Sequence, residues 1–225
     1  MKTKLFLLSI LSVGIVASCQ GPEGKRAETG EAEALEMRSS ENTRYHSIDP
    51  ERSKVEWLGK KPGGEHFGYV KLKNGTLIME EGRIAGGSFT IEMNTITVED
   101  LEDPEYNKKL TAHLKSADFF NVNEYPESEF VITRVAGPDD PGILQEGGQM
   151  YKITGNLKIK DIEKSISFDA VVDQNAAEIS ASTPQFVIDR TDWDVKFKSK
   201  SFFEDLKNDF IHDDIGLKIH LAARK

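Results

Sequence analysis

Hydrophobic and polar residues alternate along this chain with a period of two from Tyr45 onward. In 151–159 the odd-numbered positions are apolar or glycine, and the even-numbered positions are polar. The stretches 162–172 and 215–221 show the same alternation, and the Lys160-Asp161 step between the first two stretches indicates a hairpin turn. Alternation of this kind is typical of strands with one buried and one solvated face. The pattern therefore predicts long antiparallel strands.

Shorter alternating runs add further strands upstream and between these stretches. They lie around residues 55–57, 68–72, 77–79, 89–93, 127–135 and 177–189. Lys73-Asn74-Gly75 and Glu80-Glu81-Gly82 predict turns. Gly86-Gly87 indicates a bend or bulge, and Pro184 indicates an edge or bulge in its strand. The total is roughly eight or nine antiparallel strands.

Two segments depart from the strand pattern and predict short helices. Asp103-Pro104 has the form of an N-cap followed by proline at the first helical position. The helix is expected to continue to Leu114, because Tyr106, Leu110 and Leu114 are spaced by four and form one apolar stripe. A second short helix is expected over 202–208. Strands of this kind form either a sandwich or a closed barrel, and the periodicity leaves open whether the apolar faces pack on themselves or surround a guest.

The N-terminus has the features of a bacterial lipoprotein signal. Lys2 and Lys4 precede an apolar run, and Val16-Ala17-Ser18-Cys19 fits a lipobox. The run of about 14 residues is shorter than the roughly 20 needed to span a bilayer, which disfavours an uncleaved anchor. An ordinary secretory signal with a chance cysteine is the other alternative. We therefore predict a signal peptide over 1–18 and lipidation of Cys19.

The remaining chain divides into a tether and one domain. Residues 19–44 have little apolar content and mixed charge, which predicts a flexible tether because such a segment buries too little surface to order itself. Residues 45–225 are long enough for one domain with a substantial core. Cys19 is the only cysteine, so the mature protein has no internal disulfide.

The charge balance limits the choice of partners. The formal net charge is −9, and it becomes −11 when Lys2 and Lys4 are removed with the signal. An acidic surface repels nucleic acid and anionic lipid headgroups, so we expect neither as a partner. We therefore expect membrane affinity to come from the lipid anchor. More than one acyl chain makes such anchoring stable.

Several separated motifs of the domain resemble one known family. They are Ser53-Lys54-Val55-Glu56-Trp57, Gly64-Glu65-His66-Phe67-Gly68, the block 86–96, the block His113-Leu114-Lys115-Ser116-Ala117-Asp118-Phe119-Phe120 with Tyr125-Pro126 and Phe130 behind it, Gly155-Asn156-Leu157-Lys158-Ile159-Lys160, and Asp189-Arg190-Thr191-Asp192-Trp193. In this order, over about 45–223, the chain resembles the YceI-like family of periplasmic and secreted proteins that bind polyisoprenoid lipids. The lipobox is a difference, because many members have a simple cleaved signal.

The resemblance implies a fold and a ligand. The implied fold is all-β, an extended antiparallel lipocalin-like barrel of about eight strands with one or two short helices. The implied ligand is a prenyl chain or prenylquinone that fills the interior tunnel. The residues expected to line that tunnel are Trp57, Phe89, Ile91, Met93, Leu110, Leu114, Phe119, Phe168, Val172 and Phe186.

Three polar residues are candidates for contact with the ligand headgroup, namely His66, His113 and Arg190. Each also has a structural alternative. The histidines could instead form hydrogen bonds that pin the helix to the barrel mouth. The segment 189–193 could instead close a barrel end, with Arg190 buried against an acid and Trp193 as a plug.

The sequence offers little support for catalysis or for a cofactor. It contains neither a Gly-x-Ser-x-Gly elbow nor a phosphate-binding loop. The potential metal ligands His66, His113, His212 and Asp213-Asp214 lack a recognisable spacing, so we predict no metal site. The prediction is therefore a non-enzymatic barrel, without a cofactor, that sequesters or carries a polyisoprenoid or quinone-like lipid.

The predicted location is the cell envelope. Gln20-Gly21 after the cysteine lacks the aspartate that would argue for inner-membrane retention, which favours the periplasmic face of the outer membrane, with surface display as an alternative. The competing functions are an envelope stress-related enzyme acting on a lipid or quinone, and a structural barrel with a self-packed core. The oligomeric state stays open, with a dimer as one option.

Overall fold

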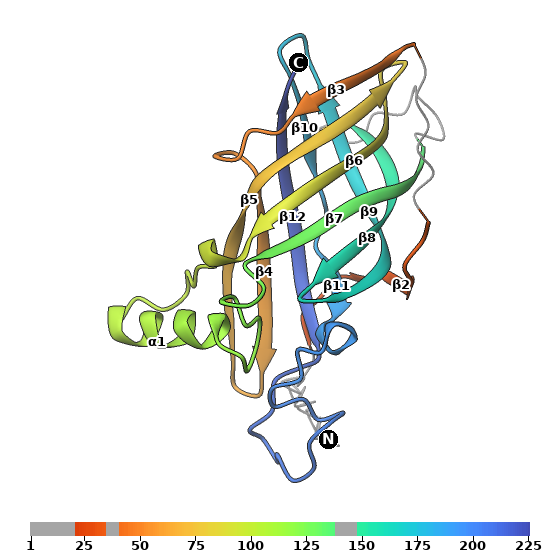
Figure 1. Cartoon of the computed structure of the whole chain (residues 1–225). Helices are drawn as coiled ribbons and strands as arrows, with labels where there is room; N and C mark the ends of the chain where they lie inside the picture. Colours follow the sequence, from red (N-terminus) through yellow and green to blue (C-terminus); the bar gives the residue numbers. More distant parts are fainter. Residues whose placement is uncertain (1–20, 35–40, 138–147) are drawn as a thin grey trace, which may run out of the picture.

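A ring of eight β-strands forms the body of the protein in the computed structural model (Figure 1). The structure describes residues 21–34, 41–137 and 148–225. The predicted signal peptide and Cys19 lie outside the described residues. The strands of the ring are β4 (Lys54–Lys61), β5 (Gly64–Glu80), β6 (Arg83–Glu92), β7 (Glu127–Ala136), β8 (Gln149–Ile159), β9 (Ile162–Gln174), β10 (Glu178–Ser182) and β12 (Asp214–Arg224).

The ring closes where its first and last strands pair. β12 lies antiparallel to β4, with Ile219 opposite Val55 and Ile215 opposite Gly59. The other neighbours around the ring are also antiparallel. The predicted antiparallel, barrel-like β-fold is therefore confirmed, and closure rather than a sandwich is the solution that the chain adopts.

Two positions of the ring are occupied by strands that are interrupted. β3 (Thr43–Ser47) pairs with the end of β5 that β4 does not reach. Likewise β10 and β11 (Phe186–Asp189) pair with opposite ends of β12 and are separated by residues 183–185. Pro184 lies in that gap, as expected, because proline has no N–H to donate to a ladder. After the gap, β11 pairs with β12 but forms no ladder with β9. This leaves a seam in the ring between β9 and β11.

The described part of the predicted tether fills this seam, which corrects the prediction of a free segment. We call residues 21–34 the N-terminal strap. Its β1 (Lys25–Arg26) lies parallel to β11, and its β2 (Glu28–Glu31) lies antiparallel to β9. Ala27, between them, is 4% exposed. The strap buries little apolar surface, but its backbone completes two open ladders and its charged residues form ion pairs with β7, β8 and β9.

The predicted turns have mixed outcomes. Glu81 and Gly82 both have positive φ and form the β5–β6 turn, and Lys160-Asp161 forms the β8–β9 turn, so these two predictions are confirmed. The turn predicted at 73–75 is wrong, because β5 runs without a break from Gly64 to Glu80 and only shifts register between Leu72 and Asn74. Gly75 serves close packing instead, since a Cβ there would lie 2.7 Å from Cδ1 of Phe89.

A bulge also interrupts the β5–β6 ladder near the glycines where one was expected. Ile78 pairs with Gly86 and Met79 with Ile84, which leaves residue 85 without a partner opposite it.

The first predicted helix is confirmed, and the second is not. In α1 (Pro104–Lys115), Asp103 accepts hydrogen bonds from the N–H groups of Glu105 and Tyr106. Tyr106 stays 63% exposed, so only the Leu110 and Leu114 part of the predicted stripe packs inward. No helix forms over 202–208, where Asp205 and Lys207 adopt positive φ values that interrupt a right-handed helix.

Two short 3₁₀ helices occur elsewhere, η1 (Met93–Thr95) and η2 (Arg190–Trp193). Within the described ranges, the structure contains no helix that combines the length and the apolar character needed to cross a membrane.

The interior separates into two apolar clusters. The larger one extends from the end of the ring near β3 to Trp193 of η2 and includes Tyr151, Ile166 and Ile179. The smaller one lies under α1 and includes Leu114, Val122 and Val195. Figure 1 shows α1 beside the end of the ring that carries the β4–β5 turn, with the connection between η2 and β12 projecting from that same end.

One glycine tests whether the segment after η1 must cross closely over the β4–β5 ladder. A Cβ on Gly68 would lie 2.1 Å from the carbonyl oxygen of Thr97, so Gly68→Ala should lower the unfolding free energy by about 1–3 kcal/mol. Gly59→Ala on the neighbouring strand is the matched control, because nothing lies within 4 Å of a Cβ there. Urea denaturation measures both variants. Equal stability of the two would contradict the close crossing.

Candidate functional site

Two adjoining apolar cavities lie inside the ring. The outer cavity, of about 370 Å³, lies between the lower ring, α1 and the connection from η2 to β12. The inner cavity, of about 110 Å³, lies deeper, and its wall is apolar except for Ser182 and Thr183. Both cavities are bordered by Val55, Ile91, Leu157 and Leu217. An outer space within the usual 300–1,000 Å³ range of ligand pockets, continued by an inner one with an almost wholly apolar wall, suits an elongated apolar molecule.

The structure places all ten predicted lining residues in these walls. Those of the outer cavity are Trp57, Ile91, Met93, Leu110, Leu114 and Phe119. Those of the inner cavity are Phe89, Phe168, Val172 and Phe186, together with Ile91 again. Their contact with a ligand stays a prediction.

The sequence reasoning missed one whole side of the outer cavity. We call residues 194–213 the mouth loop, and its Val195, Phe197, Phe210 and Ile211 complete the wall. The sequence signal for this wall was the presence of apolar residues at both ends of an otherwise polar loop. These residues follow neither the strand period nor the helix period, so the pattern could not predict which way they face.

His113 joins α1 to the mouth loop. Its ring packs edge-on against Phe119, with centroids 5.0 Å apart, and against Phe197, with centroids 4.8 Å apart. Its Nε2 lies 2.9 Å from a carboxylate oxygen of Asp118. These contacts agree with the structural alternative, in which His113 holds the helix against the barrel mouth. Because His113 also borders the outer cavity, its contact with a headgroup stays a prediction.

His66 makes the second histidine–carboxylate pair at this end. Its Nδ1 lies 2.7 Å from Oδ2 of Asp100, whose other oxygen accepts a hydrogen bond from the N–H of Phe67. Burial of Asp100 opposes its ionisation, but the bonds from His66 and Phe67 outweigh burial and lower the pKa of this carboxyl below its ordinary value. The pair fastens the segment after η1 to the start of β5.

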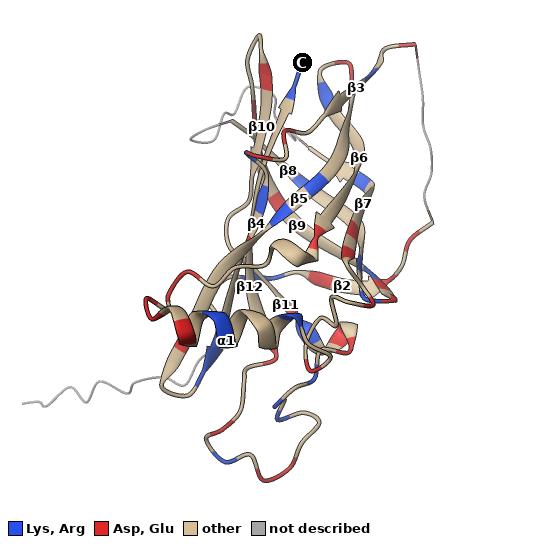
Figure 2. Ribbon diagram, turned by 60° about the vertical axis from the view of Figure 1, so that its left-hand side comes forward, with Lys and Arg blue, Asp and Glu red and all other residues tan. Residues whose placement is uncertain are grey.

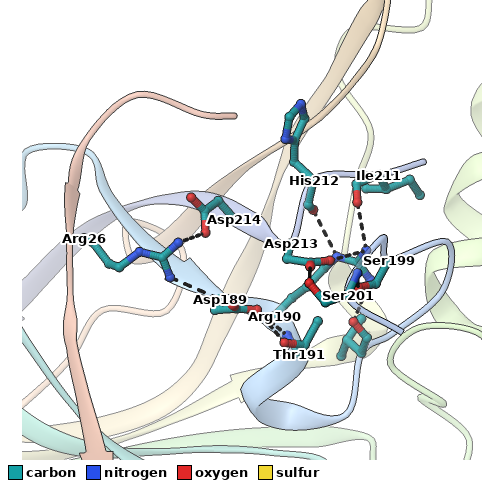
Figure 3. A network of polar contacts seen from close by, with 11 residues as sticks. Arg26, Asp189, Arg190, Thr191, Ser199, Ser201, Ile211, His212, Asp213 and Asp214 are labelled. Atoms are coloured by element: carbon teal, nitrogen blue, oxygen red, sulfur yellow. Dashed lines mark hydrogen bonds and ion pairs between the residues drawn. The ribbon is translucent and has the colours of Figure 1, made fainter. Parts of the chain in front are cut away.

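Arg190 forms its polar contacts with neighbouring segments of the chain, in agreement with the structural alternative (Figure 3). Its side chain is 2% exposed. It donates hydrogen bonds to the carbonyl oxygens of Val195, Ile211 and His212, and it pairs with Asp213 at 3.3 Å. Burial lowers the pKa of Arg190, while Asp213 and Asp189 oppose that change. Four of the five guanidinium N–H groups thus hold the two ends of the mouth loop together.

Trp193 is fully buried, as expected for a plug. Its Nε1 donates to the carbonyl oxygen of Leu157 at 2.9 Å. Because Leu157 borders both cavities, this contact anchors η2 against the middle of the interior.

One polar atom in the outer cavity wall has no partner. Ser128 is 4% exposed, borders the outer cavity, and its Oγ has no hydrogen-bond partner in the part of the chain that the structure describes. It lies opposite Ile91 in the β6–β7 ladder. A buried hydroxyl without a partner is unfavourable, so this position suits an oxygen brought in by a guest.

The open rim of the outer cavity is charged. It carries Lys60, Lys61, Lys198 and Asp209, and both signs of charge lie along this end of the molecule (Figure 2). Within 21–34, 41–137 and 148–225, no three histidine, cysteine, aspartate or glutamate side chains gather closely enough to hold a metal ion.

These features define a class of protein, a ring of antiparallel strands that encloses apolar cavities. Within that class the chain belongs to the YceI-like domain family, which it matches over residues 46–223.

Curated relatives agree over part of their length. A UPF0312 protein of Pectobacterium atrosepticum is 30% identical over 112 residues, which are 47% of this chain and 51% of that protein. Protein YceI of Shigella flexneri is 30% identical over 104 residues, which are 46% of this chain and 47% of that protein. The chain thus spans about half the length of the curated relatives it matches.

Solved structures share the fold. BcnA of Burkholderia cenocepacia superimposes with a TM-score of 0.55 at 21% identity, covering 78% of this chain and 99% of that one. A polyisoprenoid binding domain of Saccharophagus degradans superimposes with a TM-score of 0.56 at 11% identity, covering 80% of this chain and 97% of that one. At these identities the likeness extends to the fold alone.

The carboxyl of Asp100 predicts a stability that depends on pH. Because its pKa is lower in the folded protein, its contribution is fully present above the ordinary pKa of 3.8 and disappears as the pH falls through the folded value. Asp100→Asn should therefore lower the unfolding free energy by about 1 kcal/mol near neutral pH, and the difference should vanish in acid.

Urea denaturation across the pH range measures this difference. Asp118→Asn is the matched control, since Asp118 also pairs with a histidine but is 55% exposed and should contribute less. A difference between the parent protein and Asp100→Asn that grows on acidification would contradict the assignment.

Proposed function

We propose that this protein binds a polyisoprenoid or prenylquinone-like lipid in its two cavities and sequesters or carries it at the bacterial cell envelope. The observation that carries the proposal is the pair of adjoining apolar cavities, whose walls contain all the residues expected to contact such a chain. At about 0.8 kcal/mol per buried methylene, an apolar chain gains tight binding there with few polar contacts.

The lone hydroxyl of Ser128 favours a ligand that carries oxygen over a pure hydrocarbon. Its Oγ is buried in the outer cavity wall without a partner, and an alcohol or quinone oxygen would satisfy it. The description of the Saccharophagus degradans neighbour as a polyisoprenoid binding domain supports the same ligand class.

Two competing functions have weaker support. A self-packed structural barrel would leave little free space, whereas the outer cavity measures about 370 Å³. An enzyme acting on a lipid or quinone would need a reactive side chain that is available to contact the ligand. The candidates for headgroup contact were His66, His113 and Arg190. Their side chains form hydrogen bonds with other residues of the chain instead.

We also propose that the mature protein begins at Cys19 and is held by lipid on the periplasmic face of the outer membrane. The lipobox Val16-Ala17-Ser18-Cys19 supports this location. A carrier of an insoluble lipid gains from being held at the bilayer in which that lipid dissolves.

Narrowing the junction of the cavities should weaken binding of a long chain. Val55 is half-buried and borders both cavities, so Val55→Trp should reduce the affinity for solanesol about tenfold or more, since loss of contact with two methylenes already corresponds to about that factor. Native mass spectrometry and competition with a fluorescent prenyl probe measure the loading.

Val171→Trp is the matched control for this experiment. Val171 is also half-buried on a strand, but it alternates with the buried Ala170 and Val172 and therefore faces outward. Circular dichroism confirms folding of both variants. Equal solanesol binding by the two folded variants would count against the cavities as the binding site.

Replacing the lipidated residue should separate anchoring from binding. Cys19→Ala should leave the protein folded and loaded with lipid but release it from the membrane fraction. Incorporation of labelled palmitate into the parent protein, absent in Cys19→Ala, checks the modification. A variant that stays in the membrane fraction after a high-salt wash would contradict the lipid anchor.

A further inference from the structure

Two adjacent phenylalanines are exposed at the tip of the mouth loop. Phe202 is 52% exposed and Phe203 is 50% exposed. The loop leaves the outer cavity wall after Lys198 and returns to it at Asp209. The exposed pair is therefore carried on the same segment that borders the open side of the cavity.

Local contacts hold this pair in place. Ser201, the preceding residue, donates from its Oγ to Oδ2 of Asp213 at 2.6 Å, as Figure 3 shows. The ammonium of Lys196 lies 4.5 Å from the centre of the Phe202 ring. Asp213 in turn is fixed by Arg190. The two rings are thus presented on a loop clamped at both ends.

The described chain begins next to the same clamp. A Cβ on Gly21 would lie 3.5 Å from Cβ of Asp214 and 3.7 Å from Nδ1 of His212. Arg26 pairs with Asp214 and Asp189, which holds the beginning of the strap against this end of the ring. In the sequence, Gly21 follows the predicted lipidation site Cys19 by two residues.

The part of the mouth loop that carries Phe202 and Phe203, residues 194–209, has no net charge, and Asp213 beyond it is paired with Arg190. Residues 194–209 contain four lysines and four acidic residues, and Figure 2 shows both signs along the loop. Lysine and aromatic side chains together suit the headgroup and acyl boundary of a bilayer. The balance of charges fits a zwitterionic surface better than an anionic one.

We propose that the mouth loop is a membrane-docking surface, in which Phe202 and Phe203 insert into the bilayer so that the outer cavity opens toward the lipid. The partner is a zwitterionic lipid bilayer, and the proposal rests on the lipid-binding function proposed above. It adds a second membrane contact to the one that the sequence assigned to the anchor alone. The strap places Gly21, two residues after Cys19 in the sequence, at the end of the ring that carries the exposed pair.

The single cysteine allows a direct test of this orientation. The chain from Cys19 onward, prepared without lipid, is coupled through its thiol to a maleimide-headgroup lipid in phosphatidylcholine vesicles. Phe203→Trp places an indole in the docking surface. Tyr45→Trp is the matched control, because Tyr45 is 64% exposed and lies on β3 at the opposite end of the ring (Figure 1).

Brominated acyl chains should quench roughly half of the added emission in Phe203→Trp, as expected for burial about 5–10 Å into the headgroup boundary. They should leave the added emission in Tyr45→Trp unchanged. Unquenched Phe203→Trp emission, or equal quenching of both variants, would overturn the docking. Addition of phosphatidylglycerol should not increase the quenching of Phe203→Trp, and a strong increase would assign the contact to anionic lipid instead. Doubling of the mass without vesicles, with the added indole shielded, would assign the surface to a second copy of the chain and also overturn the proposal.

A transfer experiment separates docking from ligand binding. The double variant Phe202→Ser, Phe203→Ser should take up solanesol from vesicles about tenfold more slowly than the parent, while its equilibrium loading from detergent stays the same. Equal uptake rates would contradict a role of the loop in transfer. Failure of the parent to load from detergent would instead refute the proposed function, and the quenching result would still decide the orientation.

Discussion

The interior of this protein exists because its last strand pairs with its first long strand. Six residue pairs, from Ile215 with Gly59 to His220 with Lys54, join β12 to β4. The two strands are far apart in the sequence. Without that ladder the apolar face of the sheet would be open to water along two edges. Closure of eight strands gives an interior just wide enough for side chains or one small guest. The incomplete filling of this interior leaves the two cavities.

Closure is imperfect at one seam, and the N-terminal strap follows from that imperfection. β10 ends at Ser182, Pro184 lies in the gap that follows, and β11 begins beside β12 without a ladder to β9. The strap occupies the space between β9 and β11 with backbone hydrogen bonds and with Ala27 in the core. The same contacts fix Gly21 at the end of the ring where the outer cavity opens. A break in one strand thereby determines where the N-terminal segment meets the domain.

Irregular chain closes the outer cavity, and buried polar contacts take the place of a ladder there. The guanidinium of Arg190 binds carbonyl groups from both ends of the mouth loop. His113 of α1 packs against Phe197 of that loop, and Asp100 ties the segment after η1 to β5. Carbonyl groups in such segments have no regular partner, so buried donors are needed to satisfy them. The polar residues expected at a headgroup site therefore also shape the cavity.

The period-two alternation was enough to predict the strands and their inward residues such as Phe89 and Phe168, and the Asp103-Pro104 N-cap was enough to predict where the helix begins. Those features depend on neighbours along the chain, since a strand has two faces and an N-cap binds N–H groups two and three residues on. The turn expected at 73–75 was wrong because Gly75 makes room for Phe89 of the neighbouring strand, and the helix expected over 202–208 was wrong because Asp205 and Lys207 have positive φ values. Only the tertiary structure decided the closure of the ring, the docking of the strap and the cavity wall formed by the mouth loop. Each of these joins segments far apart in sequence, where no local period records which surface a residue will meet.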